Sequence, residues 1–129
     1  MLTKKLLPAL ALAGAVFGAA GTAAAAGDPA KGERVFVRCK ACHVVEDATS
    51  RIGPHLVGLF GRKAGSVEGF AYSDAMKNAD IVWDEATLDA YLADPRGYIP
   101  GNKRAFPGLR NENERADVVA YLKEATQPQ

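Results

Sequence analysis

Apolar positions with helical spacing first appear shortly after residue 27. Asp28 followed by Pro29 is typical of a helix N-cap with proline in the first turn. The predicted helix continues through Val35 and Phe36 towards Cys39. The first predicted helix therefore ends at a cysteine.

A second amphipathic pattern lies near the end of the chain. Asn111, with Glu114 three residues later, resembles a variant capping box and predicts the start of a helix. The residues that follow give this helix a mostly apolar face, formed by Val118, Val119, Tyr121 and Leu122. Gly32 on the first helix would permit a close approach. We therefore expect the two terminal helices to pack against each other.

Between these helices, two segments are rich in glycine and proline. Residues 44–72 and 95–110 show no sustained period, and this predicts loops rather than strands. Loops of this length in a small domain usually wrap something. No strand pattern is convincing anywhere, so the predicted fold class is all-α.

Two shorter helices are expected between the loops. A short piece covers residues 73–78, and a firmer helix begins at Asp84. The firmer helix places Leu88, Tyr91 and Leu92 at helical spacing and stops before Pro95. Both are too short to be stable without packing partners.

The chain begins with the pattern of a secretory signal peptide. Lys4 and Lys5 precede an apolar stretch over residues 6–20, and small residues follow up to Ala26. The apolar stretch is shorter than the ~20 residues that span a bilayer. We therefore expect export to the periplasm and cleavage after about Ala26, with no stable membrane insertion afterwards. The predicted domains are a signal peptide, 1–26, and a folded domain, 27–129.

Composition limits the core and the partners of that domain. The chain has 129 residues, and residues 27–129 keep 14 of its 16 Lys and Arg, because only Lys4 and Lys5 are lost, together with all 15 Asp and Glu. This near-neutral balance carries no signature of nucleic-acid binding. A domain this small has little apolar core of its own, so a buried cofactor would help to stabilise it.

The strongest chemical signal is the sequence from Cys39 to His43. Two thiols three positions apart on one helical turn can each add to a vinyl group of haem. The next residue, His43, places an imidazole against the iron. The motif therefore predicts one covalently attached haem c, with its iron bound on one side by His43.

Other interpretations of the cysteine pair fit the sequence less well. A disulfide between Cys39 and Cys42 is plausible in an exported chain. A thioredoxin-like redox pair would need a βαβ context, which is absent from the pattern. Zinc would need further ligands, and the other histidine, His55, is not at finger spacing.

Further motifs extend the pattern over most of the chain, and with them residues 27 to about 126 resemble class I cytochromes c, in particular the cytochrome c2 and mitochondrial-like branch. Besides the haem motif, the shared segments are Gly53-Pro54, residues 61–65 and 69–75, Trp83, Tyr91-Leu92, residues 98–101 and residues 120–123. The resemblance implies an all-α fold whose terminal helices pack together around the haem, with long loops wrapping it. It also implies a monomeric carrier of single electrons between redox partners, such as a membrane bc1-type complex, an oxidase or a reaction centre.

The resemblance assigns several haem-binding residues. It implies that the Pro54 carbonyl accepts the second imidazole N–H of His43, as partners of metal ligands do. It implies that Arg62, Tyr72 and Trp83 hydrogen-bond the haem propionates, and all three are suitable donors. It also places Tyr91 in the haem pocket. A solvated arginine and ordinary core aromatics are the simpler alternatives, and His55 is expected to be a wall residue rather than an iron ligand.

One position departs from the family. Where the family has the methionine that binds the iron as sixth ligand, this chain has Arg104. A guanidinium stays protonated and offers no lone pair to the metal. Water or hydroxide is the leading expectation for the sixth ligand, with neutral Lys103 or Met76 as alternatives. Pro107 is a second change in the same loop, and Arg104 could itself be an introduced substitution in an ordinary carrier.

The sixth ligand separates two functions. With lysine or hydroxide bound, the chain would carry electrons at a lower potential than a methionine-ligated cytochrome. With an open site, it would bind small ligands or act as a weak peroxidase. We expect a carrier rather than an enzyme, because electron transfer requires no bond-making step.

Overall fold

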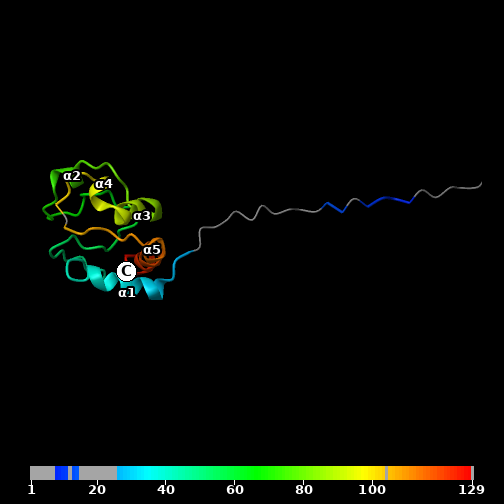
Figure 1. The fold of residues 1–129 in the computed structure, drawn as a ribbon, viewed down its shortest axis with the longest axis horizontal. Helices are drawn as coiled ribbons and strands as arrows, with labels where there is room; N and C mark the ends of the chain where they lie inside the picture. The colour runs from blue at the N-terminus through cyan, green and yellow to red at the C-terminus, as the bar shows by residue number, and fades with distance from the viewer. Residues whose placement is uncertain (1–7, 12, 15–25, 104, 129) are drawn as a thin grey trace, which may run out of the picture.

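The computed structural model describes residues 8–11, 13–14, 26–103 and 105–128. Within these residues the elements are α-helices joined by long loops, as predicted. In chain order they are α1 (Pro29–Phe36), a 3₁₀ turn (Val37–Cys39), α2 (Asp74–Lys77), α3 (Glu85–Ala93), α4 (Pro95–Tyr98) and α5 (Glu112–Ala125). Figure 1 shows α1 and α5 side by side, with α2, α3 and α4 on the opposite side of the molecule.

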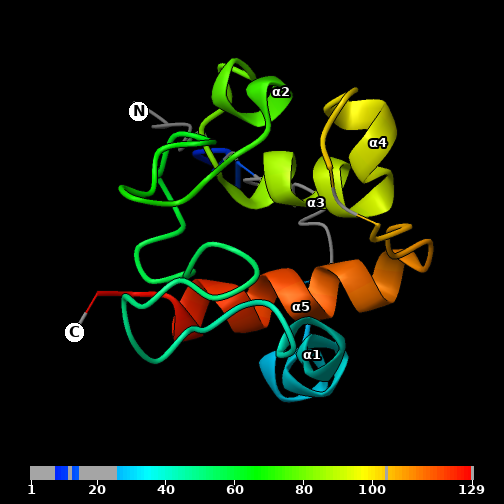
Figure 2. The same ribbon diagram turned by 90° about the vertical axis from the view of Figure 1, so that its left-hand side faces the viewer.

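The two terminal helices pack together, which confirms the prediction from their apolar faces. In Figure 2, α1 is seen end-on against the side of α5. The rings of Phe36 and Tyr121 lie with centroids 5.3 Å apart, and Phe36 is 1% exposed. A Cβ at Gly32 would overlap the backbone of Asp117, so only glycine permits this approach.

Side-chain caps define where these helices start. Asp28 accepts a hydrogen bond from the Ala30 N–H at 2.9 Å, and Asn111 accepts one from the Glu114 N–H at 3.1 Å. Only this half of the expected capping box is present, because the Glu114 carboxylate pairs with Arg38, 3.2 Å away. This exposed ion pair joins the end of the first helical segment to the start of α5.

The middle helices are confirmed with one correction. α3 starts after Asp84, which forms a reciprocal capping box with Thr87, and ends before Pro95. Residues 95–110 were expected to be loop throughout, but Pro95–Tyr98 form the single helical turn α4. Asp94 caps this turn by accepting from the Gly97 N–H at 3.1 Å, and proline is well suited to the first helical position. Local capping therefore overrides the loop signal.

The long loop is held to the segment before α3 by backbone hydrogen bonds. In the described part of the chain there is no strand, only an isolated antiparallel bridge between Lys63 and Val82. The Trp83 N–H donates to the Arg62 carbonyl at 2.9 Å, and the Ala64 N–H donates to the Ile81 carbonyl at 2.7 Å. This pairing brings two predicted haem-binding residues, Arg62 and Trp83, next to each other.

The predicted signal peptide lies largely outside the described residues. No helix in the described ranges is long and apolar enough to cross a membrane.

Candidate functional site

Cys39, Cys42 and His43 lie on one tight turn after α1. The Cys42 and His43 N–H groups both donate to the Cys39 carbonyl, at 3.1 and 2.9 Å. Both cysteines are half-buried and unpaired, so the structure contains no disulfide between them. Burial raises the pKa of the Cys39 thiol, against the lowering effect of Arg38. The turn therefore presents two thiol side chains and an imidazole within five residues.

The ring of His43 is oriented by the loop opposite. Its Nδ1 lies 2.8 Å from the Pro54 carbonyl oxygen. Since a carbonyl can only accept, Nδ1 carries the proton and Nε2 is left with its lone pair. This contact is the one that the resemblance implied, and it gives His43 the tautomer that a metal ligand needs.

Gly53 makes room for the His43 ring, a role that sequence reasoning missed. A Cβ at this position would lie 2.5 Å from Cε1 and 2.8 Å from Nδ1 of the ring. The Gly53 N–H also donates to the Cys42 carbonyl at 2.9 Å, which ties the two segments together. The sequence shows a glycine immediately before Pro54, but only the structure shows that the missing side chain leaves room for the His43 ring.

Arg62 reaches the same loop from the other side. Its Nη1 donates to the His55 carbonyl at 2.7 Å and its Nη2 to the Val57 carbonyl at 2.5 Å. Among the described residues no carboxylate forms an ion pair with this guanidinium. Burial lowers the pKa of Arg62, opposed by Tyr72. A half-buried cation that is held by carbonyl groups and has no carboxylate partner among the described residues is well suited to an anionic group of a ligand.

The remaining predicted residues surround Arg62. The Tyr72 hydroxyl accepts from the Val67 N–H at 3.1 Å, so its own O–H can still donate to a ligand. Burial raises the pKa of Tyr72, and both the Val67 hydrogen bond and Arg62 oppose this. Trp83 is 7% exposed and makes an edge-to-face contact with Tyr91, at a centroid distance of 5.2 Å. The structure thus brings Arg62, Tyr72, Trp83 and Tyr91 into one neighbourhood.

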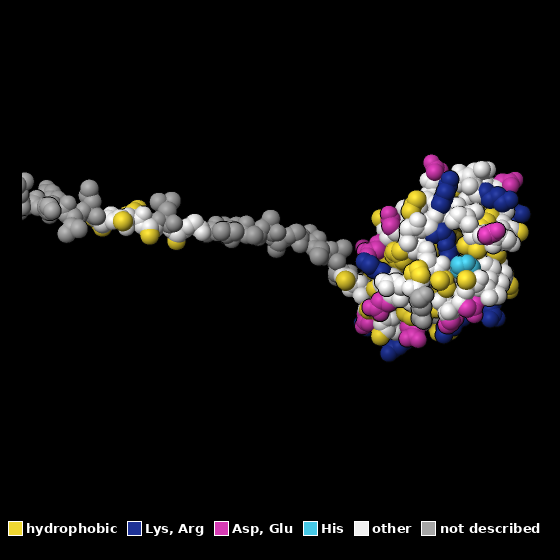
Figure 3. Space-filling model, turned by 180° about the vertical axis from the view of Figure 1, so that it is seen from behind, with side chains coloured by type: hydrophobic (Ala, Val, Ile, Leu, Met, Phe, Trp, Pro, Cys, Tyr) yellow, Lys and Arg dark blue, Asp and Glu magenta, His cyan; other side chains and the backbone are white. Residues whose placement is uncertain are grey.

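A surface hollow of about 590 Å³ adjoins Arg62. Its walls come from two stretches of the long loop and include Ser50, His55, Arg62, Val67 and Glu68. Figure 3 shows one face of the molecule, on which a histidine lies among basic and apolar side chains. The hollow is therefore lined by side chains of both charges, the positive Arg62 and the negative Glu68.

The loop after α4 is anchored at its start. Ile99 is 3% exposed, and the Asn102 side-chain amide donates to the carbonyls of Pro95 and Ile99 at 2.7 and 3.0 Å. Gly101, with φ of +88°, makes the turn between them. The side chain of Lys103 is exposed, and Arg104 lies outside the described residues.

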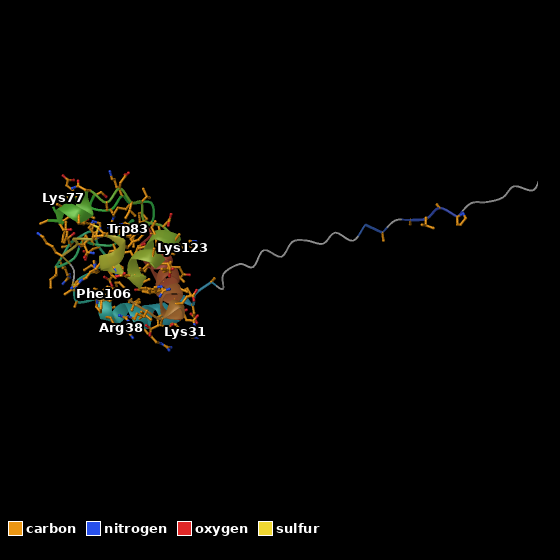
Figure 4. All side chains as sticks on the ribbon, turned by 45° about the horizontal axis from the view of Figure 1, so that its top comes forward. Lys31, Arg38, Lys77, Trp83, Phe106 and Lys123 are labelled. Atoms are coloured by element: carbon orange, nitrogen blue, oxygen red, sulfur yellow. The ribbon has the colours of Figure 1, made fainter. Side chains whose placement is uncertain are left out.

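The same loop is anchored again at its end. The Leu109 N–H donates to the Leu92 carbonyl at 2.7 Å, and Leu109 is 4% exposed. Gly108, with φ of +99°, lies against the carbonyl of Ala93. In the view of Figure 4, Phe106 lies between Arg38, just beyond α1, and Lys77 of α2. Both ends of the loop are therefore fixed to the same region, residues 92–99 at the end of α3 and in α4.

The other candidate ligands are placed as follows. Met76 is half-buried in α2 and packs against the core, and its N–H donates to Ser73 Oγ at 3.1 Å. His55 is half-buried in the hollow, with Arg62 Nη2 3.4 Å from its Nδ1. In the described part of the chain, no three His, Cys, Asp or Glu side chains gather as a metal-ion site.

The chain is similar to many proteins of one kind. Residues 29–126 match the family described as cytochrome c. A cytochrome c2 from Rhodomicrobium vannielii is 52% identical over 114 residues, which cover 88% of this chain and 91% of that protein. A cytochrome c from Chlamydomonas reinhardtii is 52% identical over 105 residues, or 80% of this chain and 94% of that one.

The fold has the same likeness. The solved structure of cytochrome cH from Methylobacterium extorquens superposes with a TM-score of 0.72 at 45% sequence identity. The match covers 76% of this chain and 99% of that one. Sequence and fold therefore point to the same family, over the part of the chain that contains the site.

Proposed function

The chain belongs to the cytochrome c family, and on this premise we propose that Cys39, Cys42 and His43 hold its haem. Members of the family bind one covalently attached haem c with its iron, and they are electron carriers rather than enzymes. This chain is such a carrier, and its partners are other redox proteins. When bound, the haem supplies a one-electron couple; the protein supplies the attachment, the orientation and the electrostatic surroundings.

The observation that carries the assignment is the orientation of His43. Its Nδ1 is held by the Pro54 carbonyl at 2.8 Å, and Cys39 and Cys42 lie on the same turn. Held in this way, the ring has its lone pair on Nε2, so binding an iron there would need no change of tautomer. Gly53 leaves space for the ring in this orientation.

A second group of residues is proposed to bind the haem propionates. Arg62 offers a half-buried cation without an acidic partner in the described residues, and Tyr72 retains a free O–H. Trp83 lies beside Arg62 through backbone pairing and can donate its indole N–H. Tyr91, packed on Trp83, would line the pocket. These donors would stabilise carboxylates that are partly removed from water.

For the sixth position of the iron we propose water or hydroxide. The resemblance places the usual methionine where this chain has Arg104, and arginine has no lone pair to offer. Lys103 is exposed, and Met76 is packed against the core from α2. Among the described residues, neither side chain makes a contact that holds it at the loop as a ligand. The absence of methionine would lower the potential.

The setting proposed for this carrier is the periplasm. The basic, apolar and small-residue segments of residues 1–26 support export and cleavage after about Ala26. Its partners there would be a membrane bc1-type complex, an oxidase or a reaction centre. The carrier would act as a monomer.

A second candidate function follows from the same substitution. If no side chain occupies the sixth coordination position of the iron, the protein would bind small ligands or react weakly with peroxide. Binding of carbon monoxide to the reduced protein favours this function. Slow or absent binding, together with reversible one-electron voltammetry, favours the carrier.

The assignment can be tested on protein produced in a host that attaches haem c. Intact mass is expected to equal residues 27–129 plus one haem, and tryptic peptides should carry the haem on Cys39 and Cys42. Fractionation should place this species in the periplasm. Haem that is released by acid and organic solvent would contradict the covalent attachment, and a retained residue 1–26 segment would contradict the cleavage alone.

A further inference from the structure

His55 and Arg62 form a close pair at the wall of the hollow. Arg62 Nη2 lies 3.4 Å from His55 Nδ1, while Nη1 of the same guanidinium donates to the His55 carbonyl at 2.7 Å. One residue therefore meets Arg62 through both its backbone and its ring. The Val57 carbonyl completes the set of acceptors.

The contact between the two side chains determines which ring nitrogen of His55 carries the proton. A guanidinium can only donate, so His55 Nδ1 must act as the acceptor and the ring proton must be on Nε2. A proton added to Nδ1 would turn this contact into two opposed donors. Only the neutral form of His55 is thus compatible with the present position of Arg62.

The backbone around His55 is held on both sides. The preceding carbonyl, that of Pro54, accepts from His43, and the following N–H, that of Leu56, donates to the Val44 carbonyl at 2.8 Å. The His55 N–H donates to Ser50 Oγ at 3.1 Å. The backbone that carries the ring is therefore fixed close to the guanidinium.

The surroundings of His55 shift its pKa in both directions. Burial and then Arg62 lower the pKa of His55, and Asp47 opposes them. Glu68 lines the same hollow, and Tyr72 interacts with Arg62 from a later part of the same long loop. The haem propionates of the proposed function would add negative charge on the side of Arg62.

We propose that His55 is a positioning residue for Arg62, and that proton uptake on His55 Nδ1 disturbs this guanidinium and raises the reduction potential of the haem. The inference rests on the proposed function, since it needs haem carboxylates at Arg62. The proton comes from solvent through the hollow, and no bond other than the new N–H is formed. A positive charge gained near the haem favours the form that has taken up an electron.

Thermodynamic linkage makes the proposal measurable in two independent ways. If protonation raises the potential, the pKa of His55 must be higher in the reduced than in the oxidised protein. A difference of one pH unit corresponds to about 59 mV for a one-electron couple. We expect a difference of a few tenths of a unit, because the charges interact across a partly solvated site.

The experiment combines voltammetry and NMR on the haem-loaded protein. The potential should rise as the pH falls through the pKa of His55. The ring resonances of His55 should titrate with the two pKa values that the potential curve requires. The variant His55→Asn keeps an acceptor near the position of Nδ1 but cannot take up a proton there. It should abolish this step and keep the potential of the high-pH form.

Three further variants separate positioning from a merely structural role. His55→Ala should abolish the step and also change the high-pH potential, since the acceptor is lost; His55→Asn should restore that potential. Asp47→Asn should move the step to lower pH, while Glu68→Gln in the same hollow should leave the step in place. A step that survives in His55→Asn would overturn the inference and leave the proposed function intact. A chain without covalent haem would instead count against the proposed function.

Discussion

The two loops that would face the proposed haem differ in whether they carry the side chain that is expected to bind the iron. On one side, residues 39–57 hold His43 by one carbonyl, one glycine and a tight turn. On the other side, residues 95–109 are anchored at Asn102 and at Leu109. The first loop presents an oriented ligand. The second preserves its anchors, but the residue at the expected ligand position is Arg104.

This contrast separates the fold of a loop from the ligand it carries. The anchors of residues 95–109 are backbone and amide contacts that do not involve the side chain at position 104. A change of that side chain can therefore leave the loop in place and still alter the iron. By contrast, a change at Gly53 or Pro54 on the His43 side would act on the imidazole directly. The comparison predicts that a change of residue 104 has a large effect on the ligation and potential of the iron. Changes at the anchors of the second loop should instead affect the stability of the fold.

The largest effect is expected from loss of the two thiols. The double variant Cys39→Ala, Cys42→Ala should lose covalent haem completely, because no other cysteine exists in the chain. Haem staining of a denaturing gel measures this directly. Lys40→Ala, an exposed position inside the same motif, is the matched control and should retain the stain. Stain that persists in the double variant would show that these thiols are not the attachment points.

The next largest effect is expected at position 104. Arg104→Met should supply a thioether ligand and raise the potential by on the order of 0.1 V, within the ~0.8 V over which axial ligands set haem potentials. Voltammetry at neutral pH gives the shift. Arg104→Leu removes the same charge without adding a ligand and should give a much smaller change. Equal shifts in both variants would mean that charge, rather than ligation, is responsible.

Two glycines allow the loops to be compared for stability. Gly53→Ala places a Cβ 2.5 Å from the His43 ring, and Gly108→Ala places one 2.8 Å from the Ala93 carbonyl at a φ of +99°. Each should lower the free energy of unfolding by roughly 1–3 kcal/mol. Guanidinium titrations measure this loss.

The haem spectrum distinguishes the two glycine variants. Only Gly53→Ala should also alter the bands that report on histidine ligation, because only that Cβ meets the His43 ring. If Gly108→Ala perturbed them equally, the two loops would not be independent and the comparison would be wrong.

A smaller effect is expected at the anchor before Arg104. Asn102→Ala removes hydrogen bonds to two carbonyls, at 2.7 and 3.0 Å, and should cost about 1 kcal/mol. A looser loop should also speed carbon monoxide binding to the reduced protein, which stopped-flow mixing can follow. Asn113→Ala, an exposed position in the first turn of α5, should change neither quantity.

Much of the fold follows from local signals in the sequence. The caps at Asp28, Asp84 and Asn111 and the apolar faces were sufficient to predict α1, α3 and α5 and the packing of the terminal pair. α4 was missed because a single turn has no period, and only the Asp94 cap before Pro95 defines it. Short elements depend on one contact rather than on a repeated pattern.

The candidate site could be predicted from the sequence where haem attachment requires a fixed spacing of residues. It was less predictable where backbone groups hold side chains in position. Cys39, Cys42 and His43 stand out by their spacing in the sequence. The space left by Gly53 and the carbonyls that hold Arg62 depend on which backbone groups meet in three dimensions. The ring of His55 was expected to be part of a wall, and its contact with Arg62 has no signature in the sequence.

The near-infrared absorption of the oxidised, haem-loaded protein tests the central claim most directly. Methionine bound to ferric haem gives a weak sulfur-to-iron band in this region. The account predicts that the unmodified chain lacks this band and that Arg104→Met gains it. A band in the unmodified protein that disappears in Met76→Leu would show methionine ligation and contradict the account.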